Sequence, residues 1–288
     1  MYMIKKKQFH DITIITVTYN SLEVLPNMLS SISPNIPVII VDNNSENKKE
    51  LRALSKKYHT KLIENETNLG FGSSCNIGAS YSKTKYLLFL NPDTQLDKNT
   101  IKYLLNAAKK YPNVSAMNPR IIEHDNSPFF KRRSHLLPRS KWQKRGLLKK
   151  DSEVSILSGS ALFVKTEHFK KVHGFDQNIF LFHEDDDLCL RLNDKCGKLM
   201  YINDAVVKHF SGTSSIRSNK IAAFKAWHMG QSKIYTIKKH NILFGKSLAI
   251  IHSLLKLLSP ESFLSKRRII KNYSFLKSIL FACIFNNH

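Results

Sequence analysis

The chain has 288 residues, 42% of them hydrophobic, and its 45 Lys and Arg against 22 Asp and Glu give a formal charge of +23. This length and apolar content allow one large or two small folded domains and exclude intrinsic disorder as the main state. Because a charge excess of this size repels itself, the sequence predicts an anionic partner, which leaves nucleic acid, membrane lipid and a phosphorylated substrate open.

Predicted strands and helices alternate along the first 110 residues. The β-branched run 12–18 predicts a strand, and residues 22–32 predict a helix that ends before Pro34. The next predicted strands are 36–41, 61–64 and 86–90, each followed by a helix within 46–58, 68–80 and 98–110. A strand over 161–164 and helices from Thr166 and Glu184 come later. The alternation indicates an α/β fold with a mostly parallel sheet.

Three predicted strands end in amide or carboxylate side chains. The segments are Tyr19-Asn20, Asp42-Asn43-Asn44 and Asn91-Pro92-Asp93. Open α/β sheets bind ligands beyond the carboxyl ends of their strands. Asn and Asp also turn chains and cap helices, which is the favoured interpretation for any single one of these ends. Their recurrence at three ends favours a binding site.

Two nucleotide-binding signatures are absent from the sequence. Gly70-Phe71-Gly72 lacks the Lys-Ser or Lys-Thr of a Walker A loop. The first predicted strand leads into Tyr19-Asn20-Ser21 rather than a glycine-rich turn, which excludes a Rossmann fingerprint.

Five motifs together resemble family 2 glycosyltransferases, and most closely the branch that contains bacterial rhamnosyltransferases. They lie in the family's order between about Ile12 and Ser215, at 17–21, 41–45, 68–78, 90–93 and 184–191. The resemblance implies a GT-A fold over residues 1–218 that binds a nucleotide-diphosphate sugar and transfers the sugar with inversion. The implied donor is a UDP- or dTDP-sugar carrying rhamnose or a hexose such as glucose or galactose.

The resemblance also implies donor-binding and metal-binding residues. Asp93 matches the last acid of the family's DxD motif, whose first acid is replaced by Asn91, and a hard oxygen ligand there suits Mg2+ or Mn2+. His209, within Lys208–Ser214, matches a position where relatives supply a metal-binding imidazole, although an isolated His is more often structural. The implied donor-binding residues are Thr18, Tyr19, Asp42, Asn44, Asn68, Gly70, Asn76 and Asn91.

Four consecutive acids, Glu184 to Asp187, begin a predicted helix. The helix dipole favours acids at this end, but four adjacent carboxylates repel one another, so a chemical role is favoured over a purely structural one. By the family's Glu-Asp pattern, Asp185 would be the general base and Glu184 would orient the acceptor. Asp186 remains an alternative base and acceptor contact. Gly159 matches the acceptor side of the family, or is an ordinary glycine at a strand entry.

Two segments concentrate the positive charge. Residues 128–150 contain nine Lys or Arg and no acid, which predicts a basic loop that covers the site and binds a phosphorylated or lipid-linked acceptor. Residues 219–288 contain twelve Lys or Arg and one acid, with Leu248, Ile251, Leu255 and Leu258 at helical spacing. These basic amphipathic helices are either a solvated cap or an attachment to an anionic membrane, and the lack of acids favours attachment.

The expected location is the cytoplasm, on the inner face of the cytoplasmic membrane. Four scattered cysteines without a CxxC pair indicate a reducing compartment, and the sequence predicts neither a secretion signal nor a membrane span. Two alternatives remain: an inactive sugar-nucleotide-binding module of a membrane complex, suggested by Asn91, and a nucleic-acid-binding protein, suggested by the charge and Trp142. The second leaves the four acids unexplained, so nucleic acid is not the expected partner.

Overall fold

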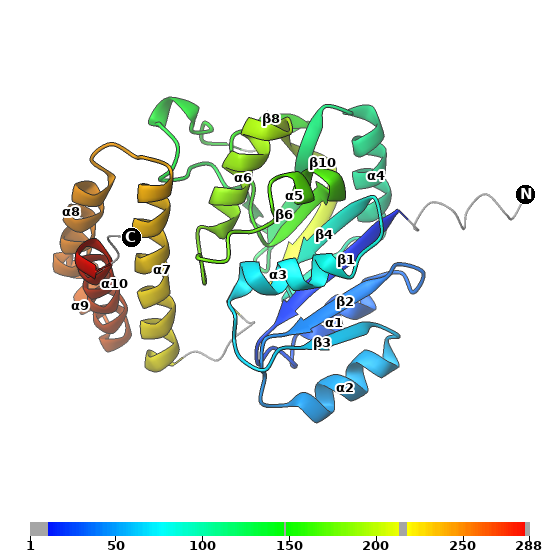
Figure 1. Ribbon diagram of the computed structural model, residues 1–288, viewed down its shortest axis with the longest axis horizontal. Coiled ribbons are helices and arrows are strands. Elements are labelled where there is room, and N and C mark those ends of the chain that lie inside the picture. Colours follow the sequence, from blue (N-terminus) through cyan, green and yellow to red (C-terminus); the bar gives the residue numbers. More distant parts are fainter. Residues whose placement is uncertain (1–10, 147, 213–217, 286–288) are drawn as a thin grey trace, which may run out of the picture.

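The structure, a computed structural model, describes residues 11–146, 148–212 and 218–285 (Figure 1). The strands are β1 (Ile12–Thr18), β2 (Val38–Asp42), β3 (Lys61–Glu64), β4 (Tyr86–Leu90), β5 (Thr94–Leu96), β6 (Val114–Glu123), β7 (Pro128–Phe129), β8 (Ser152–Val154), β9 (Ala161–Lys165) and β10 (Lys198–His209). The helices are α1 (Leu25–Ser30), α2 (Lys48–Lys57), α3 (Phe71–Ser80), α4 (Thr100–Lys110), α5 (Thr166–Lys171), α6 (Glu184–Lys195), α7 (Asn219–Lys239), α8 (Gly245–Leu258), α9 (Pro260–Phe263) and α10 (Lys266–Phe285).

One sheet of ten strands forms the centre of the molecule, with the order β3-β2-β1-β4-β9-β6-β10-β5 and with β7 and β8 paired to β6 and β10. Strands β1, β2, β3 and β4 are mutually parallel, and β6 is parallel to β10. Strand β9 is antiparallel to both β4 and β6, so β4 and β6 point the same way. Six of the ten described strands therefore share one direction, which confirms the predicted mostly parallel α/β sheet.

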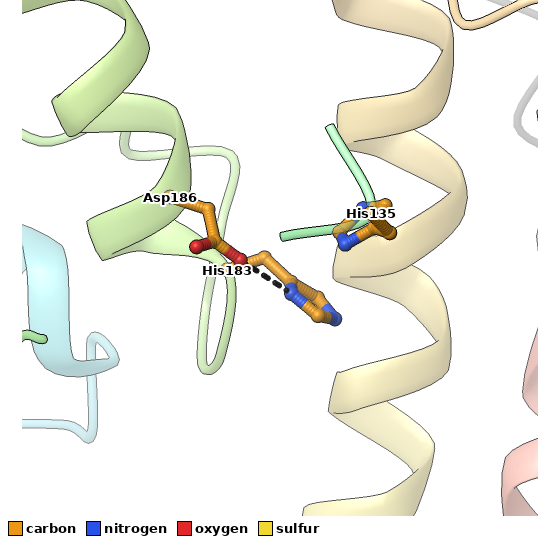
Figure 2. Close-up of side chains that lie close together, drawn as sticks. All are labelled: His135, His183 and Asp186. Atoms are coloured by element: carbon orange, nitrogen blue, oxygen red, sulfur yellow. Dashed lines mark hydrogen bonds and ion pairs between the residues drawn. The ribbon is translucent and has the colours of Figure 1, made fainter. Parts of the chain in front are cut away.

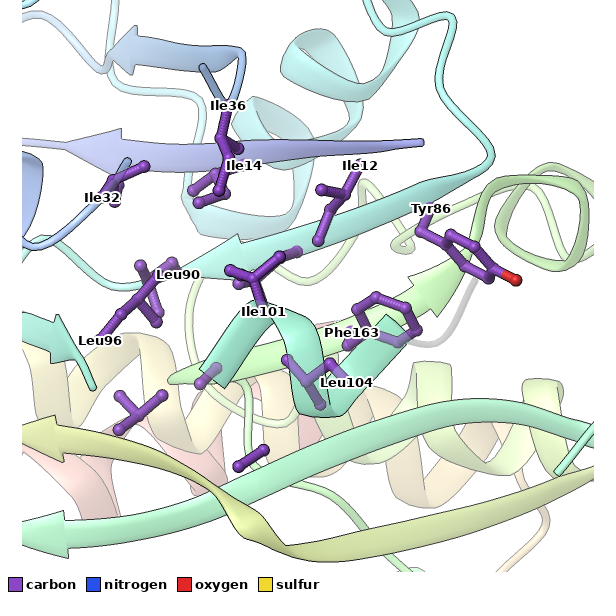
Figure 3. Close-up of a cluster of buried hydrophobic side chains, with 14 of the residues drawn as sticks. Ile12, Ile14, Ile32, Ile36, Tyr86, Leu90, Leu96, Ile101, Leu104 and Phe163 are labelled. Atoms are coloured by element: carbon purple, nitrogen blue, oxygen red, sulfur yellow. The ribbon is translucent and has the colours of Figure 1, made fainter. Parts of the chain in front are cut away.

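Helices cover both faces of the sheet. Successive side chains of β1 point to opposite faces, so Ile12 and Ile14 join one buried cluster and Ile15 and Val17 join the other. The first cluster, part of which is drawn in Figure 3, includes residues of α1, α2 and α4. The second includes residues of α3, α5 and α6. The domain is a three-layer α/β/α sandwich with a core on each side of the sheet.

Two predicted helices begin later than the sequence pattern indicates. The helix expected over 22–32 is α1, which starts at Leu25, because Pro26 lacks an amide hydrogen and suits only the first helical turn. The helix expected within 46–58 is α2, which starts at Lys48, and Ser45 before it bonds to Asp42 rather than capping the helix.

The topology brings the functional segments to one edge of the sheet. Strands β1, β2, β4, β6 and β10 all end at this edge, and the antiparallel β9 begins there. The strand-end residues Asp42 and Asn91 therefore share an edge with Gly159 and with His209 at the end of β10. The backbone hydrogen bond from Asn91 N to Ser160 O, 2.9 Å, joins the end of β4 to the start of β9. We refer to this as the carboxyl edge.

The C-terminal helices form a second, smaller packing unit. Ala226, Ile234 and Ile279 belong to a buried cluster shared by α7, α8 and α10. Within this unit α7 lies nearest to the sheet domain, between that domain and α8 and α10 (Figure 1). It contacts the segment before α6, where Ser232 Oγ donates to Leu181 O at 2.9 Å. The boundary expected after residue 218 coincides with the start of α7, and the division into two domains remains a prediction.

Candidate active site

Asn43, directly after β2, is the centre of a buried hydrogen-bond network at the carboxyl edge. Its Oδ1 accepts from Leu69 N at 2.9 Å, and its Nδ2 donates to Asn68 Oδ1 at 2.7 Å and to Gly70 O at 3.1 Å. These bonds hold the 68–70 loop against the end of β2. Asn68 and Gly70 were predicted for donor binding, whereas the organising role of Asn43 was not.

Gly70 permits a close contact between two loops. Its φ of 84° lies in the left-handed region, and a Cβ atom would stand 2.2 Å from Phe180 O. Phe71 N also donates to Phe180 O, at 3.0 Å. The start of α3 is thereby attached to the segment that leads into α6, so a larger residue at this position would displace both loops.

The predicted nucleotide residues at the ends of β1 and β2 differ in their exposure. Tyr19 is exposed, and Thr18 is buried with its carbonyl accepting from Asn43 N at 2.8 Å. Asp42 is fully buried, and both of its carboxylate oxygens accept from Ser45 N at 3.1 Å. Asp42 therefore shapes the turn through Asn44, whose φ is 69°, and its carboxylate does not face solvent in this conformation.

Asn76 and Asn91 are also engaged within the protein. The Asn76 side chain on α3 both donates to Phe175 O and accepts from Phe175 N, each at 2.8 Å. Asn76 therefore supports the turn at Gly174 and Phe175. The carbonyl of Asn91 accepts from Thr94 Oγ1 at 2.7 Å, which fixes the short loop between β4 and β5.

The predicted metal ligands Asp93 and His209 lie together, and Glu123 joins them. His209 Nε2 is 3.4 Å from Asp93 Oδ1, and His209 Nδ1 is 3.3 Å from Glu123 Oε1. Burial disfavours a charged imidazole, but the two carboxylates outweigh it and raise the pKa of His209. Strand pairing explains the contact, since β10 pairs with β5 and β6. Ser214 of the same motif lies outside the described residues.

This group of side chains fits a divalent cation. Asp93 Oδ1 is buried and has no hydrogen bond among the described residues, and two carboxylates and one imidazole are ligands that Mn2+ accepts. Glu123 was not predicted, because its strand, β6, contains Pro119, and a proline inside a run argues against a central strand.

The predicted general base Asp185 and the predicted acceptor-side Gly159 are in direct contact. Asp185 Oδ2 accepts from Gly159 N at 2.9 Å, and Asp185 Oδ1 accepts from Asp186 N at 2.9 Å. Asp185 Oδ2 also lies 2.7 Å from the ammonium of Lys131, in the basic loop. A Cβ at Gly159 would stand 3.2 Å from Asp185 Cβ, so this glycine admits the close approach. Lys131 was not predicted as an individual site residue.

The two acids that flank Asp185 differ in charge state. Burial, together with the negative charge of Asp185, raises the pKa of Glu184 to about 8, which keeps this carboxyl protonated at neutral pH. Burial has the same tendency at Asp186, but Lys131 and His183 outweigh it and hold the pKa of Asp186 well below its usual range. Side by side on one helical turn, Glu184 is a hydrogen-bond donor and Asp186 an anion.

Asp187 has a structural environment. It is fully buried and lies 2.7 Å from Arg191 Nη2, 2.7 Å from Lys239 Nζ and 2.8 Å from His240 Nε2. Burial opposes its charge, but these partners lower the pKa of Asp187 to about 2. Since Lys239 belongs to α7, Asp187 connects α6 to the C-terminal helices.

His135, His183 and Asp186 form a second group of ligand-type side chains (Figure 2). One ligand atom from each lies within 4.8 Å of the others. Burial lowers the pKa of His135 to about 3, so its imidazole is neutral. Asp186 already holds the Lys131 ammonium at 2.8 Å, and a fixed positive charge beside the carboxylate opposes a cation.

Sequence comparisons relate the chain to transferases of sugars. The profile of the family described as Glycosyl transferase family 2 matches residues 13–173. The chain is 27% identical over 261 residues to the N-acetylglucosaminyl-diphospho-decaprenol L-rhamnosyltransferase of Mycobacterium tuberculosis, covering 79% of this chain and 84% of that protein. It is 28% identical over 206 residues to rhamnosyltransferase WbbL of Escherichia coli K12, covering 64% and 77% respectively.

Solved structures show the same architecture. Staphylococcus aureus TarS (1-349) superposes with a TM-score of 0.56 at 14% identity, covering 94% of this chain and 90% of that chain. GalNAc-T7, solved with UDP, GalNAc and Mn2+, superposes with a TM-score of 0.62 at 13% identity, covering 96% and 56% respectively. At these identities the likeness concerns the fold alone, and it confirms the expected GT-A architecture.

Proposed function

The chain belongs to glycosyl transferase family 2 and is a glycosyltransferase, and we propose that it moves a rhamnosyl or hexosyl group from a UDP- or dTDP-sugar, with inversion, to a hydroxyl of a surface glycan or lipid-linked acceptor. The observation that carries the proposal is the position of Asp185. This carboxylate accepts a hydrogen bond from Gly159 N at the carboxyl edge, where the candidate metal ligands Asp93 and His209 also lie.

In the proposed reaction Asp185 acts as the general base. Its carboxylate accepts the proton of the acceptor hydroxyl while the hydroxyl oxygen forms a bond to the anomeric carbon, from the face opposite the departing nucleoside diphosphate. A single displacement of this kind inverts the anomeric centre. Glu184, protonated at neutral pH, donates a hydrogen bond that orients the acceptor.

Asp93, Glu123 and His209 would hold Mg2+ or Mn2+ beside the donor diphosphate. The bound cation would neutralise the negative charge that develops on the leaving diphosphate. The 68–70 loop and the turn through Asn44 would form the nucleotide pocket, which Asn43 keeps in shape through its bonds to Asn68 and Leu69.

Three features favour a lipid-linked, phosphate-containing acceptor at a membrane. The name of the M. tuberculosis relative specifies a diphospho-decaprenol acceptor. The loop 128–150, rich in Lys and Arg, reaches the predicted base through Lys131. Helix α8 exposes an apolar face at Leu248, Leu255 and Leu258, which suits attachment to a bilayer surface. Among the described helices none has the length and apolar content needed to cross a bilayer.

A screen of the purified protein against UDP- and dTDP-sugars tests the function. Release of nucleoside diphosphate, measured with Mn2+, with Mg2+ and with EDTA, should select one donor and should stop in EDTA. Full activity in EDTA would refute the metal site, and His209 would then be a structural residue. Binding of a donor without release under any condition would favour the alternative, an inactive sugar-nucleotide-binding module, for which Asn91 in the DxD position is the motivating feature.

A further inference from the structure

The ammonium of Lys131 forms an ion pair with Asp185, the carboxylate that acts as the base in the proposed reaction. Its Nζ lies 2.7 Å from Asp185 Oδ2 and 2.8 Å from Asp186 Oδ1. Lys131 belongs to the basic loop and precedes Asp185 by 54 residues in the sequence. Lys131 is 20% exposed and Asp185 is 16% exposed, so the pair lies at the rim of the site and a ligand from solvent can reach it.

This ion pair opposes general-base catalysis. An adjacent ammonium stabilises the ionised form of a carboxylate and makes that carboxylate a weaker proton acceptor. Asp185 Oδ2 also accepts a hydrogen bond from Gly159 N, so this bond and the contact with Lys131 together engage both lone pairs of the oxygen. An acceptor hydroxyl that approaches this oxygen has to displace Lys131. Displacement requires another anion, since an unpaired ammonium in a half-buried position is costly.

The basic loop has further positive charge to bind such an anion. Of its nine Lys and Arg, Lys131 alone has a carboxylate partner within the described part of the chain. The guanidinium carbons of Arg133 and Arg139 each lie 5.9 Å from the centre of the Trp142 ring. Guanidinium groups with no carboxylate partner are suited to phosphate oxygens.

We propose that Lys131 is an acceptor-sensing gate: it covers Asp185 in the free enzyme, and a phosphate group of the acceptor draws it away and binds it. The inference rests on the proposed function, because it assigns the general base to Asp185. It adds a phosphate-binding site at Lys131 and a reason for the enzyme to be inactive until a phosphorylated acceptor arrives. If Asp185 were free in the absence of the acceptor, it could activate water and the donor sugar would be hydrolysed.

The first test is binding of octyl diphosphate, measured by calorimetry in EDTA so that a metal-dependent diphosphate site does not contribute. The wild-type protein should bind it, Lys131→Gln should bind it about ten- to a hundredfold more weakly, and Lys131→Arg should retain most of the affinity. Lys102→Gln, which removes an equal charge from the exposed face of α4, is the matched control and should bind as the wild type does. Equal affinities for wild type and Lys131→Gln would overturn the inference.

Lys131→Gln leaves the anions of α6 unbalanced and can lower stability. The paired variant Lys131→Gln with Asp186→Asn restores the charge balance, and thermal unfolding should show that it is folded. It should also fail to bind octyl diphosphate. Binding equal to that of the wild type would mean that Lys131 only neutralises the acids.

The second test is transfer to water. With the donor identified in the screen and no acceptor present, octyl diphosphate should raise the rate of nucleoside diphosphate release by the wild type severalfold. Lys131→Gln should release the product at the raised rate without octyl diphosphate and should not respond to it. A release rate that changes neither with octyl diphosphate nor with Lys131→Gln would overturn the gate but would still support the proposed function. Binding that depends on Lys131, with no turnover of any donor, would leave the phosphate site and refute the function.

Discussion

At the residue scale, the four consecutive acids of α6 serve different purposes because their partners differ. Asp185 meets Gly159 and Lys131 at the rim of the site, Glu184 is buried and protonated, and Asp187 is buried among cations. The helix dipole acts on all of them and does not account for these differences. Their substitutions should therefore have distinct signatures.

Asp185→Asn should lower the rate of sugar transfer by about 10² to 10⁴ and leave donor affinity unchanged, because the amide keeps the bond from Gly159 N and cannot accept a proton. Steady-state transfer rates and donor binding by calorimetry measure the two effects. Asp194→Asn, an exposed acid on the same helix, is the matched control and should behave as the wild type does. An inactive Asp186→Asn with a normal Asp185→Asn would move the base to Asp186 and leave the reaction class intact.

Glu184→Gln should preserve activity at pH 7, since glutamine imitates the protonated carboxyl, and should remove the loss of activity expected above about pH 8 in the wild type. Stability follows the same sign: the pKa rises from 4.5 to about 8 on folding, so the folded state binds the extra proton and stability falls as pH rises between these values. Thermal unfolding at pH 5 and pH 8 measures this. If the stability of Glu184→Gln fell as much between pH 5 and pH 8 as that of the wild type, the raised pKa would not belong to Glu184.

At the element scale, the strands that precede polar ends and the later strand β9 were predicted well, whereas β6 and β10 were not predicted. Strands β1, β3 and β4 match the predicted ranges, and the apolar runs of β1 and β4 are buried on both sides, whereas β3 is a partly buried strand at the edge of the sheet. Strand β6 was not predicted, because Pro119 interrupts its apolar sequence pattern. In the structure β6 continues through Pro119, and the pairing with β10 changes register between Ile202 and Val206.

The candidate site was predictable only where a motif carries it. The contact between Asp185 and Gly159 and the pair Asp93 and His209 both join residues that the family motifs single out. The contact of Lys131 with Asp185, which lies 54 residues later in the sequence, depends on how a largely irregular loop folds against α6. No periodicity or spacing specifies such a long-range ion pair.

The buried carboxylate of Asp187 is one of several polar contacts that attach helix α7 to the sheet domain, beside the bonds of Ser232 to Leu181 O and of Tyr235 to Asp176. Asp187→Asn should lower the free energy of unfolding by about 3 kcal/mol, because it leaves the guanidinium of Arg191 without its carboxylate partner and leaves Lys239 paired with Asp176 alone. It should also increase proteolysis between the sheet domain and α7. Chemical denaturation and limited trypsin digestion measure the two effects, with Asp194→Asn as the control. A stability equal to that of the control would show that the other contacts of α7 hold it without Asp187.

At the scale of the whole molecule, charge and apolar surface coincide in the C-terminal helices. Residues 219–288 contribute +11 of the total +23. Leu248, Ile251, Leu255 and Leu258 of α8 are each more than half exposed. Their spacing places them on one face of the helix, so a continuous apolar strip lies among lysines. A soluble surface usually mixes both charge signs and avoids such a strip.

The full-length protein should therefore bind vesicles of phosphatidylglycerol and phosphatidylcholine at low salt and dissociate as salt rises, since each lysine near an anionic surface contributes about 1 kcal/mol and screening removes it. Leu255→Glu with Leu258→Glu should reduce binding in a sedimentation assay at least tenfold, because two charges would have to enter the interface. Tyr103→Glu, at an exposed aromatic of α4 outside the C-terminal helices, is the control and should bind normally. A wild-type protein that stays in the supernatant would refute membrane attachment, and equal binding by the α8 variant would place the contact on another surface.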